Sequence, residues 1–429
     1  MALKSNLSVV IDMGTSKLVA AAGYRNDMNK LVISGIAKTP SNGLRRGIIF
    51  NIEETAASVS KVLSNLEKQT GEHFEKINIA LAGQHLKTVD YHGEKNTSDE
   101  GIVSPSDIDH LYNEAWNAEV EIGYKVIEVI PKSFVINDEL IEKNPIGITG
   151  EKIEASYKLV ILPEAYILNL QRVMDRAGYE LGEIKHSTLA VSEAVITDDE
   201  KEMGVIVLDV GAGTTKMAVY HENRLMHTAV IPFGGEVVTR DIKEGCSVLL
   251  KWAEQLKTQY GEALGDFADD QKVVTIPGHN GWEPKEISFK SLAFIIQARL
   301  EEIMDCINVQ INKSGVEEHL GAGIVLTGGT TDMENFISLV KFRTGMDARK
   351  GNLILHFNEK NKEFVHPDNY TALGLLKMVV EKTDAIIQEK PKKIKRKKEN
   401  GGFSPLFQKV VQGVLNYIDD DNEDIPMNN

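Results

Sequence analysis

The sequence predicts an α/β fold of two related domains, because the chain is long and because one strand–turn–strand pattern occurs in it twice. A chain of 429 residues exceeds the usual size of one compact core. Residues 8–23 predict a strand, a tight turn and a second strand, since β-branched and apolar residues flank the turn at 14–16. Residues 204–220 repeat this pattern, which indicates an internal duplication.

The composition argues against several classes of function. A net charge of −15 disfavours a general nucleic-acid-binding protein, because phosphate binding needs a basic surface. Two cysteines, Cys246 and Cys306, are too few for a disulfide framework or a zinc cage, and we expect inert thiols. No segment supplies the roughly 20 apolar residues of a spanning helix, and the N-terminus lacks a secretory-signal pattern. Any membrane contact is therefore expected to be peripheral.

The two glycine turns suit the phosphates of a nucleoside triphosphate. Glycine lets backbone N–H groups approach phosphate oxygens, and the threonine and serine hydroxyls add donors. Each turn would bind the phosphates from one side. The predicted phosphate-binding residues are Gly14, Thr15, Ser16 and Lys17 in the first turn and Gly211, Ala212, Gly213, Thr214, Thr215 and Lys216 in the second.

A carboxylate closes the strand before each turn, Asp12 in the first copy and Asp209 in the second. We also match Lys216 to Lys17. A carboxylate repels phosphate, so both aspartates are predicted to act as outer partners of a hydrated Mg²⁺. Taken singly, each motif could equally be an ordinary hairpin with an acidic turn residue. Two matching copies favour the nucleotide interpretation, and a Rossmann site is disfavoured because neither turn opens a helix.

A third glycine turn follows a buried type of strand in residues 321–329, with the sequence GAGIVLTGG. Such a turn lets a flat ring lie against the backbone. Alone it is a weak signal, because strands followed by glycines are frequent in α/β proteins. After two phosphate turns, it becomes the expected adenosine contact.

These three segments together resemble the actin, sugar-kinase and heat-shock-chaperone superfamily, in which two phosphate turns and an adenosine turn occur in this order. Within that superfamily the chain is similar to the FtsA family of bacterial cell-division proteins. Four further stretches carry the narrower resemblance, which covers residues 5 to 380: 143–150 (KNPIGITG), 200–207 (EKEMGVIV), 227–242 (HTAVIPFGGEVVTRDI) and 370–376 (YTALGLL).

The resemblance implies an actin-like, ribonuclease-H-like duplicated fold of two domains, with ATP and Mg²⁺ between them and an FtsA-type inserted subdomain. It also implies adenosine contacts at Gly235, Glu302, Gly328, Gly329 and Thr330. The expected organisation is: 1–83, first domain, N-terminal part; 84–165, inserted subdomain; 166–203, return segment of the first domain; 204–366, second domain with a lobe at about 234–297; 367–383, final helix returning to the first domain; 384–402, basic linker; 403–418, amphipathic helix; 419–429, acidic tail.

Several partners are implied by the same resemblance. The lobe would receive the C-terminal tail of the tubulin-like protein FtsZ, and the inserted subdomain would contact neighbouring subunits in a filament and dock later division proteins. The basic residues of the lobe, Lys257 among them, are more simply a mixed solvated face. We therefore assign the FtsZ contact to the lobe and to no individual lysine, and we expect no nucleic-acid partner.

Weak or negligible ATP hydrolysis is expected. Relatives that hydrolyse ATP well place Glu or Gln before the second phosphate turn to orient the attacking water, and here Ser187 stands at that position. Glu193 could substitute only in a shifted register, and its simpler role is that of an exposed helix carboxylate. Because phosphoryl transfer depends on positioning and charge stabilisation, loss of the orienting group slows turnover without abolishing binding.

The C-terminal part predicts a reversible membrane anchor. A basic run at 390–398 (KPKKIKRKK) precedes residues 403–418, whose apolar side chains recur at spacings of three and four. Such a helix needs a surface to fold against, and the basic run adds attraction to an anionic leaflet. A helix packed on the protein body and a nucleic-acid role for the basic run are the alternatives. Leu415 belongs to the same apolar pattern, and the predicted membrane-binding residues are Phe403, Leu406, Phe407, Val410, Val411, Val414 and Ile418.

One feature departs from the family pattern. FtsA-like chains usually finish at or near the amphipathic helix, whereas here residues 419–429 add DDDNEDIPMNN. An anionic leaflet would repel its five carboxylates, so this segment is expected to tune release or to bind a partner.

The sequence therefore predicts a peripheral scaffold at the cytoplasmic face of the cell membrane, at the division site, where an ATP-binding polymer tethers the FtsZ ring. Two alternatives share the ATP turns. One is a soluble sugar or acetate kinase, which would need a catalytic aspartate and has no reason to keep an amphipathic tail. The other is an actin-like protein of pilus assembly or chaperone function.

Overall fold

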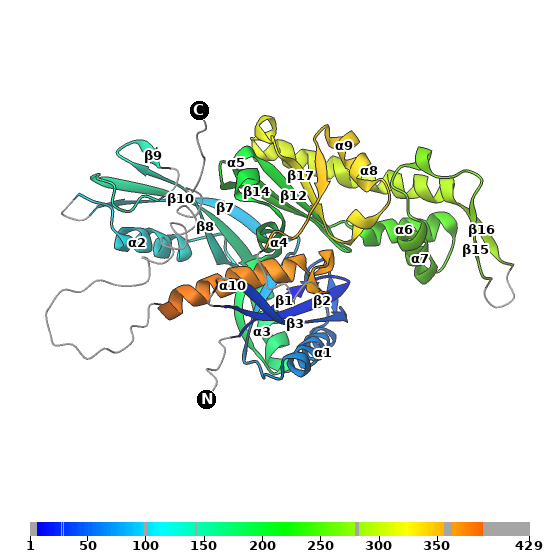
Figure 1. Ribbon diagram of the computed structural model, residues 1–429, viewed down its shortest axis with the longest axis horizontal. Coiled ribbons are helices and arrows are strands. Elements are labelled where there is room, and N and C mark those ends of the chain that lie inside the picture. Colours follow the sequence, from blue (N-terminus) through cyan, green and yellow to red (C-terminus); the bar gives the residue numbers. More distant parts are fainter. Residues whose placement is uncertain are drawn as a thin grey trace, which may run out of the picture.

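The computed structural model describes residues 7–26, 28, 30–97, 101–141, 144–278, 283–355 and 363–388. Two five-stranded sheets and one four-stranded sheet form its framework, with helices packed on their faces (Figure 1). The predicted α/β class and the duplicated two-domain architecture are confirmed.

The first sheet has the strand order β11-β6-β1-β2-β3. Side chains of β1 alternate between its two faces: Val9 and Ile11 pack in one core with α1 and α3, and Val10 packs in another with α10. The sheet therefore lies between two helical layers, α1 and α3 on one side and α4 and α10 on the other. The bounds are β1 (Ser8–Met13), β2 (Lys17–Arg25), β3 (Leu31–Pro40), β6 (Lys76–Leu81), β11 (Glu180–His186), α1 (Ile52–Thr70), α3 (Glu164–Ala177), α4 (Ser187–Val195) and α10 (Tyr370–Gln388).

The second sheet repeats this order as β14-β13-β12-β17-β18, so that β12, β13, β14, β17 and β18 correspond to β1, β2, β3, β6 and β11. In both sheets the central strand pairs antiparallel with the next strand and parallel with the strand that follows a helix. The bounds are β12 (Val205–Val210), β13 (Thr215–His221), β14 (Arg224–Ile231), β17 (Gly323–Thr327), β18 (Ala348–Lys350), α5 (Asp198–Met203), α8 (Phe289–Ser314) and α9 (Phe336–Thr344).

The register of the two hairpins corrects one prediction. Met13 pairs with Leu18 in the first hairpin and Val210 pairs with Thr215 in the second, so both turns contain four residues. By this register Lys17 corresponds to Thr214, and Lys216 corresponds to Val19. The match of Lys216 to Lys17 is therefore wrong by two residues. It rested on the shared residue type, whereas the spacing within the two hairpins sets the true correspondence.

The inserted subdomain is an α+β unit with strand order β7-β10-β8-β9 and the helix α2. Its core includes Leu111 of α2 and the fully buried Tyr157 of β10. Ser104 and Asp107 form a capping box that starts α2, with Pro105 at its first position. The bounds are β7 (Lys87–Asn96), β8 (Tyr124–Ile136), β9 (Glu139–Ile141), β10 (Lys152–Pro163) and α2 (Pro105–Trp116).

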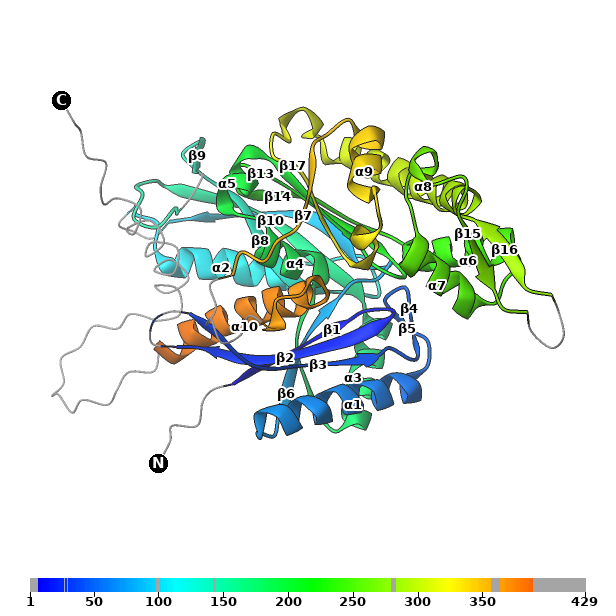
Figure 2. The same cartoon turned by 45° about the vertical axis from the view of Figure 1, so that its right-hand side comes forward.

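A lobe projects from the second domain at the side opposite the inserted subdomain (Figure 2). It comprises α6, α7, a short hairpin and the beginning of α8, which packs on α6. The bounds are α6 (Gly235–Cys246), α7 (Leu250–Tyr260), β15 (Val273–Ile276) and β16 (Lys285–Ser288); the remaining short elements are β4 (Leu44–Arg45), β5 (Ile48–Ile49) and single turns at Gly265–Phe267, Glu317–His319, Gly329–Asp332 and Pro367–Asn369.

The chain returns to the first domain through α10, which packs on α4, β1 and β2 (Figure 1). Gly374 permits this contact, because a Cβ atom at that position would lie 1.7 Å from the carbonyl oxygen of Ala190. The helix runs to Gln388, five residues beyond the predicted end at 383, since no glycine or proline interrupts it before Pro391. The basic run, the amphipathic segment 403–418 and the acidic tail lie outside the described residues.

Candidate nucleotide site

The two predicted phosphate turns face each other between the domains. A Cβ atom on Gly213 would lie 2.6 Å from Oγ1 of Thr15, so the second turn approaches the first as closely as glycine permits. The second turn is held from behind by α6, since the N–H of Gly235 donates to the carbonyl of Gly211 at 2.9 Å. The hydroxyl of Thr215 donates to the carbonyl of Phe233 at 2.9 Å, which ties the start of β13 to the same segment.

Two carboxylates and one ammonium group lie beneath these turns. Lys216 Nζ is 2.6 Å from Oδ2 of Asp209, and both side chains are nearly buried. The carboxylate of Asp12 makes no side-chain hydrogen bond or ion pair with any of the described residues. Burial, with the charge of Asp209 added, raises the pKa of Asp12 to about 6, although Lys216 and Lys17 oppose that shift. Burial would lower the pKa of Lys216, but Asp209 and Asp12 raise it overall, so it stays charged.

This arrangement fits a cation brought in with a nucleotide, because one of its two carboxylates has no ammonium partner. In the part of the chain that the structure describes, no cluster of three or more histidine, cysteine, aspartate or glutamate side chains is arranged for a metal ion. Asp209 is already paired with Lys216. A hydrated Mg²⁺ would therefore need phosphate oxygens and water for most of its coordination, with the free carboxylate of Asp12 as the available outer partner.

The third glycine turn adjoins the second phosphate turn. Gly328 has φ of 91°, and a Cβ atom there would lie 2.5 Å from Oδ1 of Asp209. Gly235 lies against Thr330, whose Oγ1 would be 3.1 Å from a Cβ at position 235. The structure thus brings Gly235, Gly328 and Thr330 together beside the second turn. Glu302 is exposed on α8 and pairs with Arg299.

Two lysines differ from the expectation. Lys17 forms an ion pair with Asp368, in the segment before α10, so its ammonium group already has a counter-charge. Lys257, which we had placed on a solvated face, is only 12% exposed. Its Nζ donates to the carbonyl of Gly235 at 3.0 Å and to Thr239 Oγ1 at 2.8 Å. Lys257 therefore lies beside Gly235, a predicted adenosine contact, and no local sequence signal distinguished it from the other lysines of the lobe.

Ser187 is the first residue of α4 and is buried. It is the residue that we expect in place of the Glu or Gln that orients the attacking water. Beside it, burial and then the charge of Lys216 lower the pKa of His186 to about 3, so this imidazole is neutral. Glu128 of β8 accepts the backbone N–H of His186 at 3.1 Å and pairs with Lys185 at 3.0 Å. A buried carboxylate of the inserted subdomain thus contacts the residues that lead into α4, a contact that sequence reasoning missed.

Glu193 is not the exposed helix carboxylate that we expected. It binds Lys201 of α5 at 3.0 Å and Lys377 of α10 at 2.7 Å. Burial alone would raise the pKa of Glu193, but the two lysines hold it at about 2. Its carboxylate joins α4 to α10 of the first domain and to α5, which packs on β12 and β13 of the second sheet.

Comparison with known structures places this architecture among the actin-like proteins. The PilM-PilN type IV pilus biogenesis complex superposes with a TM-score of 0.61 at 15% identity, over 87% of this chain and 98% of that one. MreB5 of Spiroplasma citri bound to ADP superposes with a TM-score of 0.55 at 13% identity, over 90% and 99%. The duplicated sheets and the facing glycine turns accordingly define an actin-like fold.

Sequence comparison identifies the family within that class. Residues 206–374 match the family of cell division protein FtsA, and residues 83–161 match the SHS2 domain inserted in FtsA. Cell division protein FtsA of Pseudomonas aeruginosa is 32% identical over 343 residues, covering 80% of this chain and 82% of the relative. The protein of that name from Neisseria meningitidis serogroup B is 30% identical over 410 residues, covering 94% and 97%. The chain belongs to the FtsA family.

No helix among the described residues is long and apolar enough to cross a membrane.

Proposed function

We propose that this protein is an ATP-binding, actin-like scaffold of cell division, which polymerises on the cytoplasmic face of the membrane, tethers the FtsZ ring there and recruits later division proteins. The observation that carries the proposal is the pair of matching turns, with Gly213 packed on Thr15 and with Asp12, Asp209 and Lys216 beneath them. Family membership supports the cell-division role.

Nucleotide binding is the first step to test. ATP with Mg²⁺ would place its phosphates between the two turns and its base beside Gly328, Thr330 and Lys257. Titration of the purified chain with a fluorescent ATP analogue, followed by competition with unlabelled ATP, measures the affinity. An Ala212→Glu variant adds a negative charge to the second turn and should abolish binding, whereas Asn335→Ala outside the cleft should not change it. Equal affinity of all three proteins would refute the site.

The same geometry supports the proposal of weak hydrolysis. Ser187 supplies no carboxylate, and the nearby Glu128 and Glu193 are committed to Lys185 and to Lys201 and Lys377. The expected turnover lies well below the ordinary kinase range of about 1 to 100 s⁻¹. Phosphate release measured at saturating ATP tests this, and a rate of about 1 s⁻¹ or more would contradict it.

The lobe of the second domain is the proposed receptor for the FtsZ tail. Exposed apolar side chains gather on it, and such a patch marks a protein contact. Binding of a peptide with the FtsZ C-terminal sequence should weaken at least tenfold in Phe267→Ala and should be unchanged in Phe342→Ala, a matched exposed phenylalanine on α9. Equal weakening by both variants would exclude the lobe. The residues concerned are Leu249, Leu250, Phe267, Val273 and Phe294.

Membrane attachment is proposed from the sequence of residues 403–418. Eight large apolar side chains at roughly 1.5 to 3 kcal/mol each give a gross stabilisation on the order of 10 kcal/mol before ordering costs. The basic run adds attraction to anionic lipid. Flotation with liposomes of anionic lipid should retain the full chain and release a chain that ends at Gly402. Equal flotation of the two would refute the anchor.

A further inference from the structure

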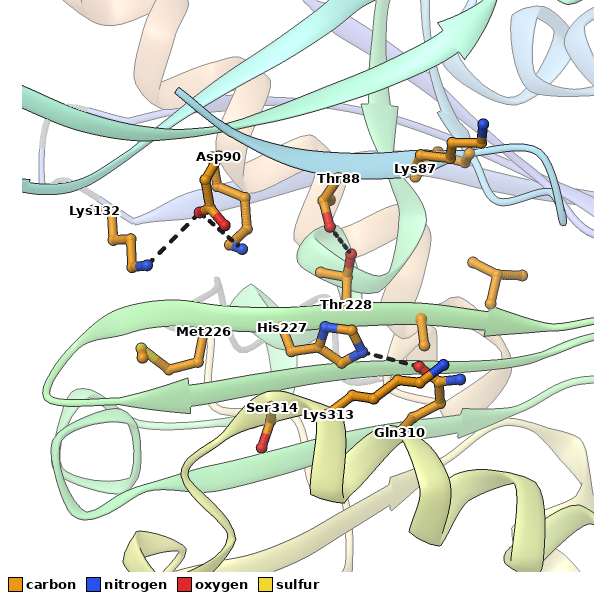
Figure 3. A pocket seen from close by; sticks show the side chains of 14 residues that line it. Lys87, Thr88, Asp90, Lys132, Met226, His227, Thr228, Gln310, Lys313 and Ser314 are labelled. Atoms are coloured by element: carbon orange, nitrogen blue, oxygen red, sulfur yellow. Dashed lines mark hydrogen bonds and ion pairs between the residues drawn. The ribbon is translucent and has the colours of Figure 1, made fainter. Parts of the chain in front are cut away.

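A cationic groove of about 510 Å³ lies between the inserted subdomain and the second domain, away from the glycine turns (Figure 3). Its walls are formed by β7, β8 and β10 on one side and by β14 and the C-terminal part of α8 on the other. The hydroxyls of Thr88 and Thr228 meet at 3.2 Å and join the two walls at one point. The groove therefore lies between the inserted subdomain and the second domain.

One wall presents the edge strand β14, and the other presents a sheet face from which Asp90 of β7, Lys158 of β10 and Lys132 of β8 project. Among the described strands, β14 is the outermost of its sheet and pairs only with β13. The unpaired edge of a strand offers backbone donors and acceptors to another extended segment. The groove is thus suited to an extended peptide more than to a compact ligand.

The charge of the groove selects for an acidic occupant. Lys132 and Lys158 share the single carboxylate of Asp90, with Nζ to Oδ1 distances of 3.6 and 3.1 Å. Lys158 is buried and therefore cannot turn away to solvent. Lys313, on the opposite wall, makes no ion pair with any described residue. Three ammonium groups thus face one carboxylate, in a chain whose net charge is −15.

The remaining polar side chains of the groove leave this charge unbalanced. Nε2 of His227 forms a hydrogen bond with Oε1 of Gln310 at 3.0 Å. Burial lowers the pKa of His227; the hydrogen bond to Gln310 opposes this shift, and the charges of Lys158 and Lys313 add to it. A neutral imidazole adds no negative charge. Lys87 points away from the groove and pairs with Glu121 at 2.6 Å.

We propose that this groove binds the acidic C-terminal segment of the same chain, residues 419–424, as an extended strand. That segment has the sequence DDDNED, with five carboxylates in six residues. An anionic leaflet would repel it, so it does not lie on the membrane beside the amphipathic helix. Placing it in the groove gives its carboxylates cationic partners and removes them from the membrane surface.

The length of the chain permits this placement. Residues 389–418 separate the described end of α10 from the acidic segment, and thirty residues span up to about 100 Å when extended. Two groups linked in one chain meet at an effective concentration of the order of mM, so a weak individual affinity is enough to fill the groove. The basic run at 390–398 is the chief competitor of the groove, because it can pair with the acidic segment directly.

Cysteine crosslinking in the full chain tests the placement. In a Cys306→Ser background, Asn422→Cys marks the acidic segment and Ser314→Cys marks the rim of the groove. Lys61→Cys on α1 is the control away from the groove, and Ile394→Cys marks the basic run. A short bis-maleimide should join 422 to 314 within one chain at least tenfold faster than it joins 422 to 61 or to 394. Adding Lys132→Gln and Lys313→Gln should reduce the rate at least tenfold with thermal unfolding unchanged, and about 0.5 M salt should reduce it likewise.

Each other result overturns the proposal. A rate at 314 equal to that at 61 means that the segment is not in the groove. Faster joining at 394 means that it pairs with the basic run, and a crosslinked dimer means that the groove takes the segment of another copy. Because none of these readouts uses nucleotide or lipid, the outcome is independent of the scaffold function proposed above.

Discussion

Replacing Asp12 by asparagine should stabilise the protein without nucleotide while weakening its capacity to bind ATP with Mg²⁺. The pKa of Asp12 is raised from 3.8 to about 6, chiefly by burial. A shift of about two units corresponds to about 3 kcal/mol between the two protonation states. Because the folded state prefers the protonated acid, the stability from this group is complete below pH 3.8 and is lost as the pH rises through 6. Asparagine resembles the protonated form at every pH.

Urea unfolding of the wild type and of Asp12→Asn between pH 4 and pH 8 measures this effect. The free energies of unfolding should coincide near pH 4, diverge as the pH rises to 6, and differ by up to about 3 kcal/mol in favour of the variant above that. The difference between the two proteins cancels the titration of all groups that they share. ATP with Mg²⁺ should stabilise the wild type more than the variant, because Asp12 is the proposed partner of the hydrated cation.

Asp107→Asn is a control with the opposite sign. Burial would raise the pKa of Asp107, but Lys95 and the side chain and backbone of Ser104 bind its carboxylate and hold the pKa below its ordinary value. The stability that it contributes is present above the unfolded pKa and is lost as the pH falls. This variant should therefore be less stable than wild type at pH 7, by about 1 kcal/mol or more through loss of the cap. A pH-independent difference for Asp12→Asn, or a destabilisation at pH 8, would refute the reasoning.

Three further predictions follow from close contacts and one buried ion pair. Gly213→Ala puts a Cβ against Thr15 and should weaken ATP binding about tenfold, or by about 1.4 kcal/mol, in a fluorescence titration; unchanged affinity would mean that the turns do not close on phosphate. Glu193→Gln leaves Lys201 and Lys377 without their shared carboxylate and should cost about 3 kcal/mol in urea unfolding at pH 7, and a loss below about 1 kcal/mol would show that solvent screens the pair. Gly374→Ala drives a methyl group into the carbonyl of Ala190 and should cost about 1 to 3 kcal/mol, seen as a lower Tm, whereas an unchanged Tm would show that α10 shifts freely on α4.

The sequence predicted most of the fold because the relevant signals are local. Alternating apolar residues define β1 and β12, glycines define the turns that follow, and their repetition implies two matching sheets. Residue identity alone misaligned the hairpins, since the pairing of Val210 with Thr215 fixes the register and no single residue reports it.

Contacts between distant segments lay beyond the sequence. Glu128 and His186 are separated by 58 positions and meet only because β8 packs beside β11. Lys257 resembles its neighbours in sequence, and its distinction comes from the approach of α7 to the carbonyl of Gly235. The sequence suggested that Glu193 is exposed, because its partner Lys377 lies 184 positions away and only the fold brings α10 beside it.

The corrected register explains why a duplicated cleft should bind its ligand asymmetrically. The two aspartates occupy equivalent places at the ends of β1 and β12, but only β13 carries a lysine opposite its aspartate; β2 carries Val19 there. Asp209 is consequently neutralised by Lys216, whereas Asp12 has no direct partner among the described residues and an elevated pKa. A cation arriving with phosphate would relieve the electrostatic cost at Asp12 and gain little at Asp209. The free energy of nucleotide binding should therefore fall mainly on the first domain's turn, and closure of the two domains should depend on Asp12 more than on Asp209.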